Sequence, residues 1–228
     1  AMATIGVVQH QHGGACAQSG ENWNQGHGTQ TRGRAGAQTR RTAGYEDPDD
    51  NIPPDPPLPV LRPLQPRPPS FSTREFRTAL GMFATGVTVV TARGAEGQLV
   101  GLTANSFNSV SMDPPLVLWS LALASASLPV FATGAHYAIN VLASDQVALA
   151  EQFAARGIDR WAGVEHHPGI SGAPLLAGAA ATFECFNRSR YEEGDHVIFV
   201  GEVERCNHRA GALPLLYHGG RFYTEHPL

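Results

Sequence analysis

Small polar side chains gather in the stretch TANSFNSVSMD, which runs from Thr103 to Asp113. The stretch contains hydroxyl and amide groups, has its single charge at Asp113, and leads into the apolar sequence PPLVLWSL. Small side chains let a flat ligand approach the backbone closely, and exposed N–H groups can donate to a ring that becomes anionic on reduction. On composition alone, the simpler interpretation is a turn rich in Ser, Thr and Asn that satisfies its own backbone.

A second candidate for chemistry is His196, which follows Gly194 and Asp195 in the sequence GDHVIFVGEV. Its imidazole is flat, can stack on another ring, and can donate to a carboxamide or a phosphate. Asp195 either fixes the tautomer of that imidazole or only shapes the turn before the strand. The adjacent pair His166 and His167 does not predict a metal site, because neighbouring side chains on a strand point in opposite directions and no acidic or cysteine partner is suitably spaced.

The elements that position these residues start near Ser70. Ser72 and Glu75 have the spacing of a capping box, which predicts the first turn of a helix, and Gly86 is expected to end that helix. A second, short helix is predicted over residues 127–134. One face of the first helix carries apolar residues: Phe76, Leu80 and Phe83.

A third helix is predicted over residues 144–156, with Ser144 or Asp145 as its cap. A polar loop around residues 192–195 is expected to join two long strands, and Gly219-Gly220 predicts a hairpin. Many short strands with few helices predict an antiparallel barrel, and the sequence has neither the βαβ rhythm of a Rossmann sheet nor a GxGxxG or Walker A motif. The predicted strands are residues 87–93, 99–107, 114–123, 136–143, two within 178–209, and two within 213–226.

The composition excludes several classes of protein. The net charge of −4 argues against electrostatic binding of nucleic acid, and no apolar run of about 18 residues predicts a membrane span. The cysteines Cys16, Cys185 and Cys206 are far apart and odd in number, so neither a disulfide framework nor a zinc site is predicted. Cys185 lies in an apolar strand and is expected to be an inert core thiol. Because the N-terminus also lacks a signal-peptide pattern, we expect a cytoplasmic protein.

Residues 1–69 do not have the pattern of a folded domain. They are rich in Gly, Gln and Thr, and residues 48–69 contain ten prolines. Such a segment buries too little apolar surface to offset the entropy of ordering it, so we predict a disordered N-terminal extension ahead of a domain over residues 70–228. A plain linker is the simplest interpretation of the Pro-rich part, although a docking peptide or an arm packed on the domain has the same composition.

Four segments, in this order and spacing, resemble the flavin reductase-like family: FRTALGMFATGVTVVTA, GLTANSFNSVSMDPPLVL, YAINVLASDQVALAEQFA and GDHVIFVGEV. Members of that family have the FMN-binding split-barrel fold. The family includes NAD(P)H:flavin oxidoreductases that serve as small components of two-component flavin monooxygenases. The resemblance covers residues 70–228 and implies a mainly β, antiparallel, Greek-key-like split barrel with a few peripheral helices.

The resemblance also implies where a flavin, FMN or FAD, is bound. The phosphate is expected near Ser125, Ala126 and Ser127, where no basic residue occurs, so hydroxyls, N–H groups and the helix that begins near Leu128 would have to hold it. Arg156 either supplies the missing positive charge or is a solvated residue at a helix end. The implied flavin-binding residues around the ring and beyond are Thr103, Ala104, Asn105, Ser106, Phe107, Ser109, Val110 and Phe153.

In the same family the GDH motif lies on the nicotinamide side of the flavin, which assigns Asp195 and the catalytic residue His196 to holding NADH or NADPH. Hydride transfer to the flavin needs no acid–base pair, only two flat rings held in contact. The resemblance further implies a homodimer and a flavin-dependent monooxygenase that receives diffusing reduced flavin. Two alternatives stay open: an oxidoreductase that retains its flavin and reduces another acceptor, and a flavin-binding module without turnover.

Overall fold

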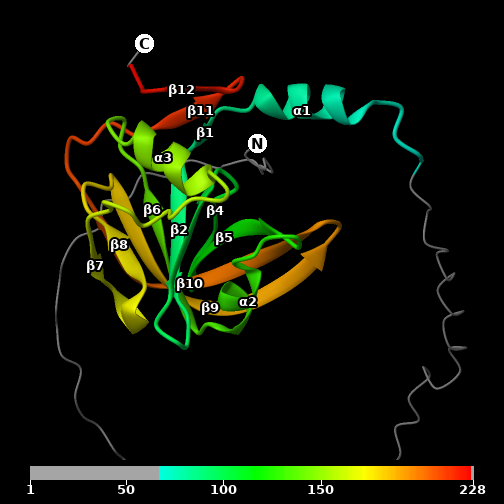
Figure 1. Ribbon diagram of the computed structural model, residues 1–228. Coiled ribbons are helices and arrows are strands. Elements are labelled where there is room, and N and C mark those ends of the chain that lie inside the picture. The colour runs from blue at the N-terminus through cyan, green and yellow to red at the C-terminus, as the bar shows by residue number, and fades with distance from the viewer. Residues whose placement is uncertain (1–66, 227–228) are drawn as a thin grey trace, which may run out of the picture. The chain divides into compact units, whose positions relative to one another are not determined.

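A computed structural model describes residues 67–226 (Figure 1). Every strand pairing that joins named strands there is antiparallel, which confirms the predicted mainly β fold. Most of the predicted N-terminal extension, residues 1–66, lies outside the described residues, so the division of the chain near residue 70 stays a prediction. The elements are α1 (Thr73–Gly81), β1 (Thr85–Gly86), β2 (Thr88–Arg93), β3 (Leu99–Ala104), β4 (Asn108–Met112), β5 (Pro115–Ala122), α2 (Leu128–Thr133), β6 (His136–Val141), α3 (Val147–Ala154), β7 (His166–Pro168), η1 (Ile170–Gly172), β8 (Pro174–Leu176), β9 (Ala181–Glu193), β10 (His196–His208), β11 (Leu216–His218) and β12 (Arg221–Tyr223).

The main sheet is forced to curl by a short connection. Its strand order is β3-β2-β6-β9-β10-β5-β4, so β3 and β4 are the two edges, yet only residues 105–107 separate them. In a flat sheet of seven strands the edges would lie about 29 Å apart, at about 4.8 Å per spacing. Four Cα steps, from Ala104 to Asn108, span at most about 15 Å. The edges therefore approach each other without forming a ladder, and the barrel is split at that seam.

The strand β2 separates two hydrophobic clusters. Adjacent residues of a strand point to opposite faces, and Val90 contributes to the cluster around Trp119, whereas Val89 contributes to the cluster around Phe153. Both valines are fully buried. Residues 88–92 of this strand are all buried, which reflects burial on both of its faces.

Aromatic rings fill the interior of the barrel. Trp119 of β5 stacks on Phe199 of β10 with ring centroids 4.8 Å apart, and it meets Phe131 and Tyr137 edge-on at 5.0 and 5.7 Å. Cys185 is buried in the same cluster, where burial raises the pKa of its thiol to about 12, as expected for an inert core thiol.

The first helix confirms one prediction and corrects another. The capping box is present, because Ser72 Oγ accepts the N–H of Glu75 at 3.2 Å and Glu75 Oε2 accepts the N–H of Ser72 at 2.7 Å. The helix ends at Gly81 rather than at Gly86. Gly86 belongs instead to the short strand β1, where it pairs with Leu216, so tertiary pairing overrides the helical pattern.

The start of α3 also differs from the expectation. Neither Ser144 nor Asp145 is the N-cap; Gln146 occupies that position and makes no side-chain cap bond. Its side chain instead accepts the N–H of Ala143 at 3.0 Å and donates to the carbonyl of Ala177 at 2.8 Å. Gln146 therefore ties the chain before the helix to the strand region that follows it.

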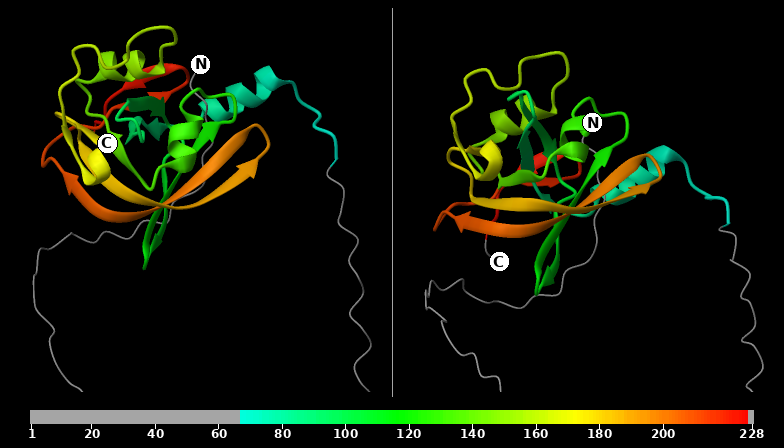
Figure 2. Two further views of the ribbon diagram at one scale, coloured as in Figure 1. Left: turned by 60° about the horizontal axis from the view of Figure 1, so that its bottom comes forward. Right: turned by 90° about the horizontal axis from the view of Figure 1, so that it is seen from below.

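Two hairpins agree closely with the sequence. The turn at Gly219-Gly220 joins β11 and β12, and both glycines have the positive φ that a tight turn of this kind requires. The polar loop between β9 and β10 is shorter than expected and consists of Gly194 and Asp195 alone. Figure 2 shows β9 and β10 as a long, curved ribbon, and it is this ribbon that carries His196 at its turn.

The helix α1 extends away from the strands and buries none of its residues (Figure 1). Within residues 67–226, the helices are all too short or too polar to cross a membrane.

The stacked pair in the barrel core gives a direct test of the packing. We expect Phe199→Ala to lower the free energy of unfolding by about 3–5 kcal/mol, because the substitution removes the ring and its contacts with Trp119 and leaves a cavity. Tyr191→Ala, at a 56% exposed position on the neighbouring strand, should change it by less than about 0.5 kcal/mol. Urea unfolding followed by circular dichroism measures both, and equal effects would contradict this account of the core.

Candidate functional site

A hydroxyl in the β3–β4 link fastens the seam region of the barrel to β5. Ser106 Oγ accepts the N–H of Ser120 at 2.9 Å and lies 3.4 Å from the carbonyl oxygen of the same residue, to which it donates. Both residues are buried. Because Asn108 pairs with Leu118, Ser106 stands where the β4–β5 ladder would continue, and its side chain replaces the missing backbone partner.

The residues before Ser106 are held on both sides of β3. Thr103 Oγ1 donates to the carbonyl of Ala150 in α3 at 2.6 Å. Ala104 is buried in the barrel core, and its carbonyl accepts the hydroxyl of Thr88 at 2.8 Å. Asn105 is also buried. The side chains of Thr103 and Ala104 in the predicted flavin segment are therefore packed against the protein itself.

The residues after Ser106 become progressively more exposed. The ring of Phe107 is half-buried, 5.3 Å from the ring of Phe183. Ser109 and Val110 lie exposed on β4, and the N–H of Ser109 donates to the side chain of Asn108 at 2.9 Å. Ser109 and Val110 are thus the accessible end of the predicted segment.

Three predicted parts of the site converge at the end of β5. His196 pairs with Ala122, and the N–H of Leu123 donates to the carbonyl of Asp195 at 2.9 Å. Ser106 is bound to the same strand only two residues before Ala122. The β3–β4 connection, the GDH turn and the turn over residues 125–127 are therefore neighbours, although 90 residues of sequence separate Ser106 from His196.

The turn after β5 uses much of its own hydrogen-bonding capacity. The N–H of Ser127 donates to Ser125 Oγ at 3.3 Å, that of Leu128 to the carbonyl of Ser125 at 3.0 Å, and that of Val130 to the carbonyl of Ser127 at 3.2 Å. Ser127 makes no side-chain cap bond to α2. A phosphate at this turn would therefore rely more on the hydroxyls and on the exposed Ala126 than on the start of the helix.

His196 is oriented by its neighbour. Its Nδ1 lies 2.6 Å from Asp195 Oδ1, and its side chain is 13% exposed. The hydrogen bond that His196 donates lowers the pKa of Asp195, and electrostatic attraction by the same imidazole lowers it further. The carboxylate is consequently an acceptor, which places the proton of the neutral imidazole on Nδ1 and a lone pair on Nε2.

The other ring nitrogen of His196 provides the fit test for a ligand. Nε2 is buried and has no hydrogen-bond partner among the described residues. A buried acceptor without a donor is costly, so an N–H donor supplied by a bound molecule would satisfy it. The amide group of a nicotinamide has such a donor, which fits the predicted role.

Phe153 and Arg156 are not brought to the end of β5 by any described contact. Phe153 has no exposed surface and meets Trp161 edge-on at 5.0 Å, which is the environment of a core residue. Arg156 lies exposed in the loop after α3. Of the predicted flavin-binding residues, these two belong to α3 and the loop after it rather than to the strands and turns that meet at the end of β5.

Sequence reasoning missed the residues that hold this loop in place. Arg160 donates from Nη1 to the carbonyl of Gly101 at 3.0 Å and from Nε to the carbonyl of Ala155 at 2.8 Å. Trp161 Nε1 donates to the carbonyl of Leu99 at 3.0 Å. All three acceptors are backbone carbonyls, which leave no signature in a sequence. The same holds for Ser120, whose backbone is the partner of Ser106.

A family model described as the flavin reductase like domain matches residues 80–226. The chain belongs to the flavin reductase-like family. It is 47% identical to the FMN reductase (NADH) SmoA of Agrobacterium fabrum over 151 residues, which cover 66% of this chain and 85% of the relative. It is 42% identical over 151 residues to the reductase component of the flavin-dependent trigonelline monooxygenase of Acinetobacter baylyi, of whose length the match spans about half, 48%.

Solved structures of this family share the fold. The NADH:FAD oxidoreductase SgcE6 of Streptomyces globisporus, in complex with NAD and FAD fragments, has a TM-score of 0.65 and 40% identity. The alignment covers 68% of this chain and 93% of that one. The split barrel predicted from the sequence of this flavin reductase-like chain is therefore confirmed.

The flavin reductase-like site offers positioning rather than proton chemistry. The hydroxyls of Thr103 and Ser106 bind the protein's own backbone, and the oriented imidazole of His196 has a buried Nε2 without a partner among the described residues. Among residues 67–226 no group of three His, Cys, Asp or Glu side chains is arranged to hold a metal ion. Such a site suits the alignment of two flat molecules between which a hydride passes.

The seam bond is testable by deleting a single hydroxyl. We expect Ser106→Ala to lower the free energy of unfolding by about 1–3 kcal/mol, because the buried N–H of Ser120 loses its acceptor. The exposed Ser109 on the next strand is the matched control, and Ser109→Ala should change stability by less than about 0.5 kcal/mol. Urea titrations of both variants, compared with the parent chain, decide whether the bond has this role.

Proposed function

We propose that this chain is an NAD(P)H-dependent flavin reductase that transfers a hydride from NADH or NADPH to FMN or FAD and releases the reduced flavin. The observation that carries the proposal is the convergence at the end of β5, where β10, which carries His196 with its buried Nε2, and the link that carries Ser106 both bind the same strand. Relatives named as an NADH-dependent FMN reductase and as an NADH:FAD oxidoreductase support the same activity.

The residues of the chain have distinct tasks in this proposal. The backbone from Thr103 to Phe107, together with Ser109 and Val110, approaches the flavin ring, and Ser125, Ala126 and Ser127 lie toward its phosphate. Asp195 holds the imidazole of His196 so that Nε2 accepts a hydrogen bond from the nicotinamide amide. A bound flavin supplies the chemistry itself by accepting the hydride at N5 from C4 of the nicotinamide.

The direct test is steady-state oxidation of NADH and NADPH by the purified full-length chain, with FMN and with FAD. The loss of reduced-nicotinamide absorbance is followed at increasing concentrations of free flavin, well above the protein concentration. Turnover that rises with free flavin and then saturates is the expected result. Turnover only of protein-bound flavin would identify an enzyme that retains its flavin, and no turnover with any pair would leave a flavin-binding module.

We further infer a partner for the product. The trigonelline relative is named as the reductase component of a flavin-dependent monooxygenase, which supports a monooxygenase as the acceptor of the reduced flavin. No direct contact with this partner is needed, because reduced flavin can diffuse. We also infer a cytoplasmic location, which agrees with Cys185, a buried free thiol.

The role of His196 is separable from flavin binding. We expect His196→Ala to raise the KM for NADH or NADPH about 2- to 10-fold, because one hydrogen bond to the nicotinamide side is lost. The flavin Kd, measured by fluorescence quenching, should be unchanged. His167→Ala, which removes an exposed imidazole on β7, is the control and should alter neither quantity. Unchanged kinetics of the His196 variant would remove this residue from the site.

A homodimer belongs to the same proposal. Large apolar side chains are exposed on and near α1, at Phe76, Met82 and Phe83, and on β4, at Val110 and Met112, the last of which is 88% exposed. Exposed apolar patches of this kind mark interaction surfaces. Because Val110 is also one of the proposed flavin residues, a second copy that covers β4 would place the flavin close to the subunit interface.

We expect Met112→Glu to weaken the dimer at least about 10-fold, because a charge would be buried against apolar side chains. Ile158→Glu is the matched control, since Ile158 is also exposed but lies in the loop after α3. Sedimentation equilibrium over a range of protein concentrations measures both. A parent chain that is monomeric at every concentration would overturn the proposed dimer.

A further inference from the structure

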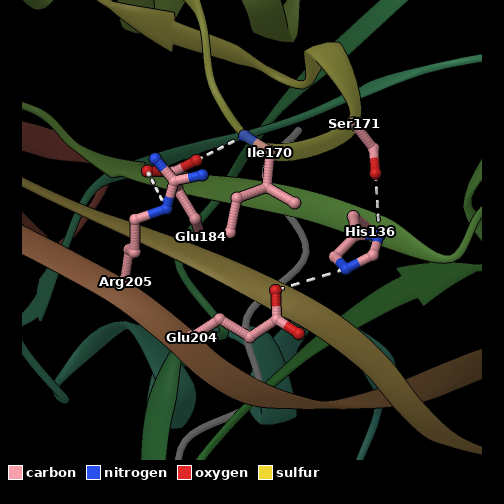
Figure 3. Close-up of polar contacts among 6 residues, drawn as sticks. All are labelled: His136, Ile170, Ser171, Glu184, Glu204 and Arg205. Carbon is pink, nitrogen blue, oxygen red and sulfur yellow. Dashed lines mark hydrogen bonds and ion pairs between the residues drawn. The ribbon is translucent and has the colours of Figure 1, made fainter.

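A second group of polar side chains lies on the outer side of the sheet, and the proposed flavin chemistry does not use it (Figure 3). Ser171 Oγ is 2.9 Å from Nδ1 of His136, and Nε2 of the same ring is 3.3 Å from Glu204 Oε2. The three residues come from η1, β6 and β10. A hydroxyl, an imidazole and a carboxylate thus form one continuous chain.

The order of the contacts fixes where the protons lie. A carboxylate only accepts hydrogen bonds, so the nitrogen that faces Glu204 carries the proton of the neutral ring. The lone pair is then on Nδ1, and the hydroxyl of Ser171 donates to it. This is the arrangement of a hydroxyl nucleophile, its general base and the group that orients the base. Compared with the usual serine hydrolase, the two nitrogens of the imidazole exchange roles.

The backbone at Ser171 is the second unusual feature. Its φ is 54° and its ψ is 19°, and it is the one residue other than glycine with a positive φ among residues 67–226. A serine persists in this conformation only when its surroundings impose it, and such residues cluster at functional sites. The residue itself is exposed, and its neighbour Gly172 has no side chain that would cover it.

The turn that carries Ser171 is held independently of His136. The N–H of Ile170 donates to the carboxylate of Glu184, which is almost buried and lies 3.8 Å from Nε of Arg205 (Figure 3). A Cβ added to Gly169 would collide with the same carboxylate. Glu184 therefore fixes the turn, so the bond between Ser171 and His136 is not needed for that purpose.

We propose that Ser171, His136 and Glu204 form an acyl-transfer site that cleaves activated esters, independently of flavin reduction. Ser171 Oγ attacks the carbonyl carbon, its proton passes to Nδ1 of His136, and the ester C–O bond breaks. His136 returns that proton to the leaving alcohol or phenol, and water then hydrolyses the acyl-serine by the same route. Glu204 is a positioning residue that acts through His136.

The surroundings of Ser171 define the class of ester. The N–H groups of Gly172 and Ala173 donate to the carbonyls of Gly169 and Ile170, so they are not available to stabilise an oxyanion. Loss of a single oxyanion donor slows acyl transfer by about 100- to 1,000-fold in an established hydrolase. The nearby cation is Arg93, whose Nη1 would lie 3.3 Å from a Cβ on Gly172. Only esters with good leaving groups, such as aryl esters, are therefore expected to react.

The full-length chain is treated with a fluorophosphonate in the absence of nicotinamide and flavin, and the modified peptide is identified by mass spectrometry. A fluorophosphonate reports the nucleophile directly, because the serine oxygen displaces fluoride. The expected result is an adduct on Ser171 in the parent chain, together with release of para-nitrophenolate from para-nitrophenyl acetate. An unmodified Ser171, with or without adducts on other serines, would overturn the proposal whatever the outcome of the flavin assay.

Variants separate a nucleophile from a serine that is merely exposed. His136→Gln should slow the modification of Ser171 about 100-fold, the lower end of what a general base contributes. Glu204→Gln should slow it about 2- to 5-fold, as expected for a partly exposed ion pair. The control is Glu202→Gln, the same change on the same strand in a carboxylate that pairs with Arg188 instead. Equal rates in the Glu204 and Glu202 variants, or a Ser171 adduct that forms as fast without His136, would refute the relay.

Discussion

The short link between β3 and β4 is the constraint on which the rest of the structure depends. Only three residues join the two edges of a seven-stranded sheet, and they are too few to span a flat sheet, so the sheet must curl. Curling brings the edges together but does not pair them, and the hydroxyl of Ser106, within the link, continues the neighbouring β4–β5 ladder. The same link carries the small residues proposed to face the flavin. Closure of the barrel and formation of the site are therefore consequences of one local geometry.

Two ways of using a histidine can be compared within this chain. His196 has a carboxylate on Nδ1 and leaves Nε2 buried without a partner among residues 67–226. His136 has both nitrogens engaged, one by Glu204 and one by Ser171. In the first case the imidazole is suited to hold a ligand, and in the second it is suited to polarise a neighbouring hydroxyl. The difference lies in which groups surround the ring, not in the ring.

Local patterns in the sequence were sufficient for much of the fold. The capping box at Ser72, the Gly219-Gly220 hairpin and the core position of Cys185 follow from nearest neighbours and periodicity, and the structure confirms all three. The end of α1 was not predictable in this way, because Gly86 pairs with Leu216, which lies far along the chain. Contacts such as those of Ser106 with Ser120, or of Ser171 with His136, join residues whose sequence separation conceals their proximity. Such contacts require the topology before they can be inferred, and the backbone partner of Ser106 has no residue type to search for.

The burial of β2 on both faces has a consequence for how the domain unfolds. Val89 and Val90 belong to different hydrophobic clusters, yet they are joined by a single peptide bond. Loss of either cluster would expose an apolar face of β2 to water. The resulting displacement of β2 would then disrupt the other cluster, which packs on the opposite face of the same strand. The two clusters are therefore energetically coupled, and the domain is built as one cooperative unit rather than as a barrel with a separately stable layer beneath α3.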